Sequence, residues 1–80
     1  MKVIVTGGAG FLGYHIGTRI NEITNFNEST FFDIAPFPEG DYNKEINCIY
    51  GDVRDAKQMD EITKGADVVI HCAAALPLWK

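Results

Sequence analysis

The chain has 80 residues, of which 46% are hydrophobic, and its formal net charge at pH 7 is −4. This length fits one domain or part of one, and it excludes an enzyme with separate cofactor and substrate domains. No cluster of lysine and arginine in the sequence suits nucleic acid or an anionic membrane, and no apolar run approaches the ~20 residues of a membrane helix. We therefore expect a soluble, cytoplasmic chain without nucleic-acid or membrane partners.

Near the N-terminus, a strand pattern changes into a helix pattern. Residues 2–5 include a short β-branched run and lead into Thr-Gly-Gly, which predicts a strand followed by a turn. The next segment repeats every four residues, and this period predicts a helix that ends near residues 21–25. The apolar face expected for this helix consists of Leu12, Ile16 and Ile20.

The middle of the chain predicts two strands separated by a loop. Residues 30–32 form an apolar run that stops at Asp33, and residues 46–50 form a third strand. Between them, residues 35–41 contain two prolines and a glycine, a composition typical of a loop.

The last third predicts a second helix and a fourth strand. Asp55 suits the N-cap of a helix over residues 56–64, and Gly65 suits the left-handed position that ends it. The apolar residues of 66–72 are consecutive, as in a parallel strand covered on both faces. The helix residues expected to face the sheet are Met59 and Ile62. The alternation predicts an α/β fold, namely the first half of a doubly wound Rossmann-type parallel sheet, incomplete, with strand order 3-2-1-4.

Two cysteines, Cys48 and Cys72, are far apart in the sequence and belong to no Cys-x-x-Cys pair. The neighbouring His71 would point to the opposite face of the strand from Cys72, a poor arrangement for sharing a metal ion. We expect reduced, buried cysteines and no metal site.

A glycine-rich segment lies where the first strand becomes the first helix. Gly7, Gly10 and Gly13 match G-x-x-G-x-x-G, and Gly8 with the last two matches G-x-G-x-x-G. Without a Cβ, Gly10 lets the backbone approach a pyrophosphate, and Gly13 lets the helix lie against the sheet. Free N–H groups at the start of the helix would point at the phosphates. The pattern predicts a dinucleotide-binding loop.

Asp33 lies about 20 residues after the last glycine of this segment, at the end of the second predicted strand. A carboxylate in this place accepts hydrogen bonds from the adenosine ribose of a dinucleotide. It would repel the additional phosphate of NADP, and after Ile34 no lysine or arginine follows until Lys44. The predicted cofactor is NAD.

Four motifs together resemble those of the extended short-chain dehydrogenase/reductases. They are TGGAGFLG after KVIV, FFD, GDVRD and DVVIHCAAA. More closely, they resemble the NAD-dependent epimerase/dehydratases that act on sugar nucleotides, and the related hydroxysteroid dehydrogenases. The resemblance covers nearly the whole chain. It implies an NAD-dependent oxidoreductase that acts by transient hydride transfer on a sugar nucleotide or a steroid-like alcohol.

The resemblance also implies a set of cofactor-binding residues. Phe11 and Leu12 would donate backbone N–H groups to the pyrophosphate, and Asp52 would accept from the adenine amino group, with Val53 against the adenine. Cys72 and the two alanines after it would line the channel near the nicotinamide. The complete set is Gly7, Gly10, Phe11, Leu12, Asp33, Ile34, Asp52, Val53, Cys72, Ala73 and Ala74.

The catalytic residues that the resemblance implies are missing from these 80 positions. Catalysis in the family resides in a Tyr-x-x-x-Lys pair with a serine or threonine, where tyrosine is the general acid or base. None of Tyr14, Tyr42 and Tyr50 has a lysine four positions later, and His71 is interpreted as a packed strand residue. We expect residues 1–80 to be the N-terminal part of a dinucleotide-binding domain, inactive by itself. The substrate domain, the small-molecule substrate site and any homo-oligomer contacts would lie later.

Two other functions fit part of the pattern. A dinucleotide-sensing module would keep the fold and lack the chemistry, so that NAD would bind without turnover. A methyltransferase that binds S-adenosylmethionine also has a glycine turn after its first strand and an acidic residue after its second. Its ligand carries a sulfonium ion and no phosphate, whereas Gly13 and the helix N-terminus favour an anion.

Overall fold

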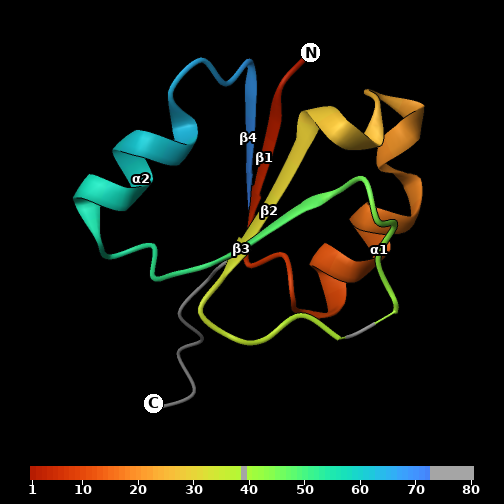
Figure 1. Cartoon of the computed structure of the whole chain (residues 1–80), viewed down its shortest axis with the longest axis horizontal. Coiled ribbons are helices and arrows are strands. Elements are labelled where there is room, and N and C mark those ends of the chain that lie inside the picture. Colours follow the sequence, from red (N-terminus) through yellow and green to blue (C-terminus); the bar gives the residue numbers. More distant parts are fainter. Residues whose placement is uncertain (39, 73–80) are drawn as a thin grey trace.

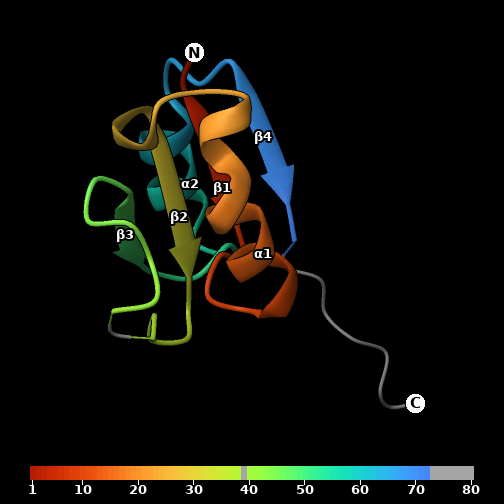
Figure 2. The same ribbon diagram turned by 90° about the vertical axis from the view of Figure 1, so that its right-hand side faces the viewer.

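The computed structural model describes residues 1–38 and 40–72. In these residues four strands form one parallel sheet in the order β3-β2-β1-β4, which confirms the predicted order. The strands are β1 (Val3–Thr6), β2 (Ser29–Asp33), β3 (Asn47–Tyr50) and β4 (Val68–His71). Figure 2 shows them side by side, with the first helix in front.

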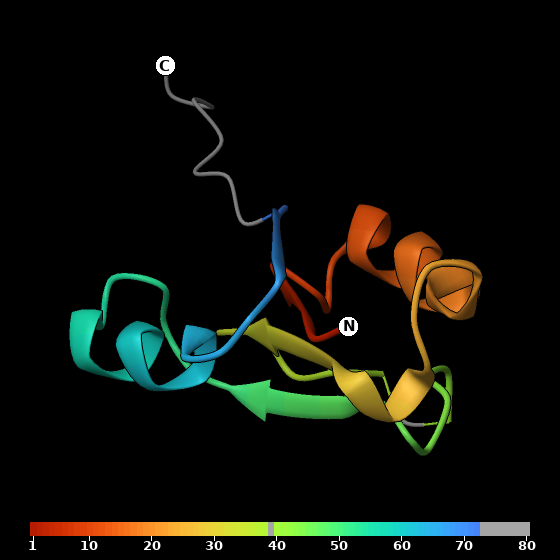
Figure 3. The same ribbon diagram turned by 90° about the horizontal axis from the view of Figure 1, so that it is seen from above.

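Two α-helices lie on opposite faces of this sheet (Figures 1 and 3). Helix α1 (Phe11–Arg19) connects β1 to β2 through two short 3-10 helices, η1 (Ile20–Glu22) and η2 (Phe26–Glu28). Helix α2 (Ala56–Thr63) connects β3 to β4. The two crossovers run in opposite directions along the sheet, so a right-handed path places their helices on opposite faces.

The core is centred on β1, because this strand has a hydrogen-bonded neighbour on each side. All four of its residues are fully buried. The buried apolar cluster consists of Val3, Val5, Ile20, Phe31 and Ile46. The parallel strands therefore share a well-packed core, and their carboxyl ends lie together at one end of the sheet. The glycine loop begins there.

Helix α1 packs through two glycines as well as through part of the predicted apolar face, since Ile16 packs against the core and Ile20, directly after the helix, is buried. Gly13 and Gly17 are buried, whereas Leu12 is 59% exposed, so its predicted core position is wrong. A Cβ at Gly17 would lie 3.3 Å from ring atoms of Phe31 and Tyr42. The helix comes this close because the glycines have no side chains, and the close approach turns Leu12 away from the sheet.

Helix α2 has the predicted caps but packs loosely. The Asp55 carboxylate accepts a hydrogen bond from the N–H of Gln58 at 3.1 Å, and Gly65 adopts a φ of 76°, as expected. No residue of α2 is buried, and Met59 and Ile62 are only half-buried against the sheet. We expected these two residues to face the sheet, and they are shielded from solvent only in part.

The outer strands are more exposed than their sequences predict. Val69 of β4 is 49% exposed, although the consecutive apolar residues predict cover on both faces. Cys48 of β3 is exposed, which contradicts the predicted burial of both cysteines, and Cys72 is half-buried. These residues are exposed because, among the described residues, β3 and β4 are the two edge strands of the sheet.

Candidate functional site

The glycine loop joins β1 to α1 at the carboxyl edge of the sheet. Gly7 has a φ of 73°, in the left-handed region that favours glycine. Its N–H and that of Gly8 donate to the carbonyl oxygen of Phe32 at 2.7 and 3.1 Å. The N–H of Gly10 donates to the carbonyl oxygen of Gly7 at 3.2 Å. The loop is thus tied to the end of β2.

Close packing requires two of the glycines in this segment to have no side chain, but not a third. A Cβ at Gly13 would lie 2.6 Å from both Cα and O of Gly8, and a Cβ at Gly8 would lie 2.7 Å from Cβ of Phe31. At Gly10 the nearest atom would be the oxygen of Gly7 at 3.5 Å, an ordinary contact. Close packing explains Gly8 and Gly13. Gly10 has space beside it that a ligand can use.

Asp33 lies directly beside this loop. Its Oδ2 accepts a hydrogen bond from the N–H of Ala9 at 2.9 Å, and its Oδ1 accepts one from the N–H of Ala35 at 2.9 Å. A carboxylate can accept about four hydrogen bonds, so each oxygen retains capacity for a further donor. The neighbouring Ile34 is exposed. The predicted ribose-binding carboxylate is therefore within one hydrogen bond of the predicted phosphate loop.

The N-terminus of α1 is open to an anion. The helical ladder begins with the N–H of Tyr14, which donates to the carbonyl oxygen of Gly10 at 2.8 Å, so the amides of Phe11 and Leu12 precede it. The first turn contains no acidic residue, and Gly10 at the N-cap has no side chain. The side chain of Phe11 is 82% exposed, so it lies at the surface rather than in the core. The positive end of the helix dipole is thus unopposed.

The next group of predicted residues follows β3. The N–H of Gly51 donates to the carbonyl oxygen of Asp33 at 2.9 Å, which joins the ends of β3 and β2. Asp52 forms an ion pair with Arg54, with 2.7 Å between Oδ2 and Nη2. Hydrogen bonds from Arg54 hold the pKa of Asp52 below its ordinary value, so this carboxylate is charged at neutral pH. Val53 is half-buried next to it.

The end of β4 lies against the end of β1. Thr6 and His71 are register partners, and their Oγ1 and Nδ1 atoms are 2.6 Å apart. His71 is exposed, so its interpretation as a packed residue is wrong, because β4 is an edge strand here. The N–H of Cys72 donates to the carbonyl oxygen of Thr6 at 2.8 Å, and burial raises the pKa of its thiol. Ala73 and Ala74 lie outside the described residues.

Tyr42 contacts the glycine loop, a role that the sequence did not predict. Its hydroxyl donates to the carbonyl oxygen of Gly8 from the loop between β2 and β3. Burial raises the pKa of Tyr42 to about 12. The two residues are 34 positions apart, and no spacing rule connects a loop tyrosine with a glycine turn. The aromatic residue in a proline-containing loop was the only signal that the sequence offered.

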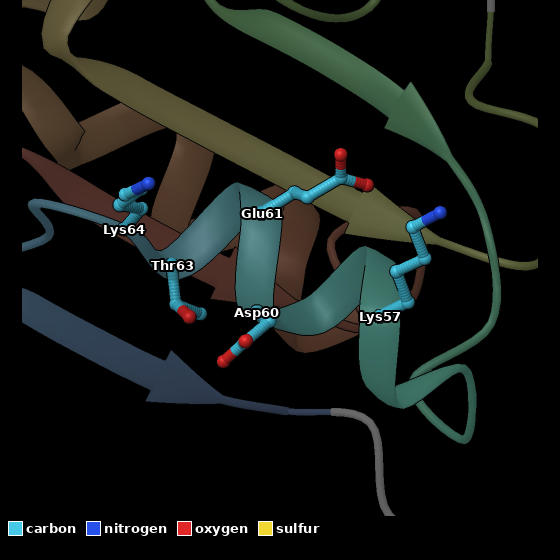
Figure 4. Close-up of a pocket in the computed structure, with 5 residues that line it drawn as sticks. All are labelled: Lys57, Asp60, Glu61, Thr63 and Lys64. Atoms are coloured by element: carbon cyan, nitrogen blue, oxygen red, sulfur yellow. The ribbon is translucent and has the colours of Figure 1, made fainter.

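Two hollows on the described part of the surface lie away from these residues. One of about 330 Å³ lies on α2, where Figure 4 shows its charged and polar side chains. They belong to Lys57, Asp60, Glu61, Thr63 and Lys64. Another of about 400 Å³ is mainly apolar and lies between α1 and Ile70 of β4. Neither hollow contains a residue of the candidate site.

The described residues contain neither a metal-binding cluster nor a membrane-spanning helix. Within residues 1–38 and 40–72, no group of three or more His, Cys, Asp or Glu side chains could hold a metal ion. No helix in the same residues is long and apolar enough to cross a bilayer. The groups that the site offers to a ligand are backbone N–H groups and the carboxylates of Asp33 and Asp52.

Comparison with protein families identifies the relationship. The model of the 3-beta hydroxysteroid dehydrogenase/isomerase family matches residues 4–80. The chain belongs to this family. The predicted membership of the extended short-chain dehydrogenase/reductases is thereby confirmed, through the hydroxysteroid dehydrogenases that the motifs also resemble.

Individual relatives agree with this assignment. A 3 beta-hydroxysteroid dehydrogenase/Delta 5→4-isomerase of Monkeypox virus is 35% identical over 94% of this chain and 22% of its own length. A putative UDP-glucose 4-epimerase of Methanocaldococcus jannaschii is 34% identical over 92% of this chain and 24% of its own. The chain thus spans less than a quarter of the length of these curated relatives.

Solved structures of related enzymes share the fold. The structure of MoeE5 in complex with UDP-glucuronic acid and NAD has a TM-score of 0.73 and is 30% identical. The similarity covers 96% of this chain and 23% of that one. The predicted Rossmann-type fold is therefore confirmed by both the sheet order and this similarity.

Proposed function

We propose that this chain is the NAD-binding part of an NAD-dependent oxidoreductase that acts on a secondary alcohol. The observation that carries the proposal is the hydrogen bond of 2.9 Å between the N–H of Ala9 and the carboxylate of Asp33. It joins the glycine loop to the carboxylate next to the open N-terminus of α1. One edge of the sheet thereby offers donors for a pyrophosphate beside an acceptor for ribose hydroxyls.

The proposal assigns the predicted residues to parts of the cofactor. Gly7 and Gly10 would lie against the pyrophosphate, with the amides of Phe11 and Leu12 as donors. The ribose would lie at Asp33 and beside Ile34. The adenine would lie at Asp52 and Val53. Cys72, with Ala73 and Ala74, would lie toward the nicotinamide. NAD supplies the hydride acceptor when bound, and these residues bind and orient it.

NAD is proposed rather than NADP because Asp33 is negatively charged where NADP carries its additional phosphate. Arg54 is the first cationic residue after β3, and it forms an ion pair with Asp52. The additional phosphate of NADP would therefore lie beside the Asp33 carboxylate, and Arg54 would not be free to neutralise it.

A steroid-like alcohol is the first substrate class to test, because the matched family is that of 3-beta hydroxysteroid dehydrogenases. A sugar nucleotide is the second, because a putative UDP-glucose 4-epimerase is 34% identical and MoeE5 was solved with UDP-glucuronic acid. We also propose that residues 1–80 form the N-terminal part of a dinucleotide-binding domain in a cytoplasmic protein. Its substrate residues and any homo-oligomer contacts would lie outside this stretch.

Calorimetry on the full-length gene product tests cofactor binding. NAD should bind at least tenfold more tightly than NADP, and S-adenosylmethionine should bind weakly or not at all. Tighter binding of NADP, or of S-adenosylmethionine, would contradict the proposal. Following NAD reduction at 340 nm with a 3β-hydroxysteroid, and epimer formation with a UDP-hexose, then distinguishes the substrate classes. Binding of NAD without turnover of either would favour the sensing module.

A further inference from the structure

The peptide unit between Gly8 and Ala9 is held at both of its polar ends. Its carbonyl oxygen accepts the hydroxyl proton of Tyr42, and its N–H donates to Asp33 at 2.9 Å. The described residues contain no cis peptide bond, so the C=O and N–H of this unit point in opposite directions. Two side chains thus hold opposite edges of one peptide plane, directly before the N-cap residue Gly10 of α1.

Tyr42 is itself fixed by packing. Its ring forms edge-to-face contacts with Phe31, Tyr14 and Phe37, at centroid distances of 5.8, 5.9 and 5.5 Å. The close approach of α1 at Gly17 brings the helix backbone against the same ring. Such packing limits the ring to one orientation. Since burial raises its pKa to about 12, the hydroxyl keeps its proton at neutral pH and remains a donor.

The other polar groups of the loop show why this one peptide matters. The N–H groups of Gly7 and Gly8 already donate to Phe32, so the end of β2 determines their direction. The N–H of Gly10 donates to Gly7, so the amides available to a ligand begin with Phe11, at the start of α1. A rotation of the peptide between Gly8 and Ala9 would redirect the chain that leads into those amides.

We propose that Tyr42 is a positioning residue for the phosphate-binding loop. Through the Gly8 carbonyl it sets the orientation in which the loop and the first turn of α1 meet a pyrophosphate. The inference rests on the proposed NAD-binding function and assigns to the loop between β2 and β3 a role in cofactor affinity. Tyr42 contacts no cofactor in this role, since it acts on the protein backbone.

The test replaces Tyr42 by phenylalanine in the full-length protein, with Tyr14→Phe as the matched control from the same aromatic cluster. Calorimetry measures ADP-ribose, which carries the pyrophosphate, and adenosine, which lacks it. Tyr42→Phe should weaken ADP-ribose binding about tenfold, the scale of one buried hydrogen bond, and leave adenosine binding within twofold. Tyr14→Phe should leave both unchanged. Equal losses for both ligands, or no loss for ADP-ribose, would overturn the inference.

A second measurement needs no ligand and separates this inference from the proposed function. Amide hydrogen exchange in the free protein should become faster at Ala9 in Tyr42→Phe, because the peptide is then held at one end only. Exchange in β1 should stay as in the wild type. Unchanged exchange at Ala9 would overturn the inference. Failure of the wild type to bind NAD or ADP-ribose would instead overturn the proposed function, whatever the exchange shows.

Discussion

Replacing Gly10 by valine should abolish NAD binding and leave the fold intact. The backbone at Gly10, with φ −81° and ψ −178°, is extended and suits any residue, including a β-branched one. Its new Cβ would meet only the oxygen of Gly7, at the ordinary distance of 3.5 Å. The loss of a glycine N-cap costs ~0.5–1 kcal/mol, and reduced freedom of the unfolded chain offsets ~0.4–1 kcal/mol. The free energy of unfolding should therefore change by less than ~1 kcal/mol.

The effect on the ligand should be much larger. In the proposed complex the pyrophosphate passes beside Gly10, so a branched side chain there would occupy its path. We expect an affinity loss of at least about 100-fold, which corresponds to ~2.7 kcal/mol. Gly13→Ala is the informative contrast. Its Cβ would lie 2.6–2.7 Å from backbone atoms of Gly7 and Gly8, and overpacking of this kind costs ~1–3 kcal/mol.

The assay combines calorimetry with NAD, far-ultraviolet circular dichroism and a thermal melt for each variant. Gly10→Val should retain the wild-type spectrum and melting temperature within a few degrees and bind no measurable NAD. Gly13→Ala should melt at a lower temperature because its backbone contacts must shift. Normal NAD binding by Gly10→Val would refute the assignment of the phosphate loop. Unfolding of Gly10→Val would refute the packing argument.

Three further predictions concern the carboxylates and the edge of the sheet. Asp33→Ala should weaken NAD binding by ~1.5–3 kcal/mol per lost hydrogen bond and narrow the ratio of NAD to NADP affinity, and an unchanged ratio would contradict the ribose assignment. Arg54→Ala should raise the pKa of Asp52 in an NMR titration, since hydrogen bonds from Arg54 depress it. The pair's stabilisation is present above the ordinary carboxyl pKa and disappears as the pH falls through the depressed value. The isolated chain should be inactive and should self-associate or melt below the ~45–65 °C of mesophile domains, because Val68 and Val69 of the edge strand are exposed. Val69→Lys should reduce that association in sedimentation, and a monomer melting cooperatively in this range would contradict it.

Local sequence determined the order of the elements and the position of the candidate site. The turn of Gly7, the caps of α2 and the strand positions depend on backbone preferences that act over a few residues. The spacing from the glycine turn to Asp33 reflects the length of one strand–helix–strand unit, so it predicted which carboxylate lies beside the loop. Parallel strands then align their carboxyl ends at one edge, which is why the sequence could place the edge itself.

Tertiary structure decided which faces are buried and which side chains hold the loop. The period of α1 predicted Leu12 in the core, but the helix packs closest where Gly13 and Gly17 have no side chains, and Leu12 is exposed. His71 is exposed because it lies on an edge strand. There, the neighbouring strands rather than the composition of the strand itself decide how much of a side chain is buried. The contact of Tyr42 with Gly8 depends on how a long loop folds back over α1, and no local preference encodes a pairing across 34 positions.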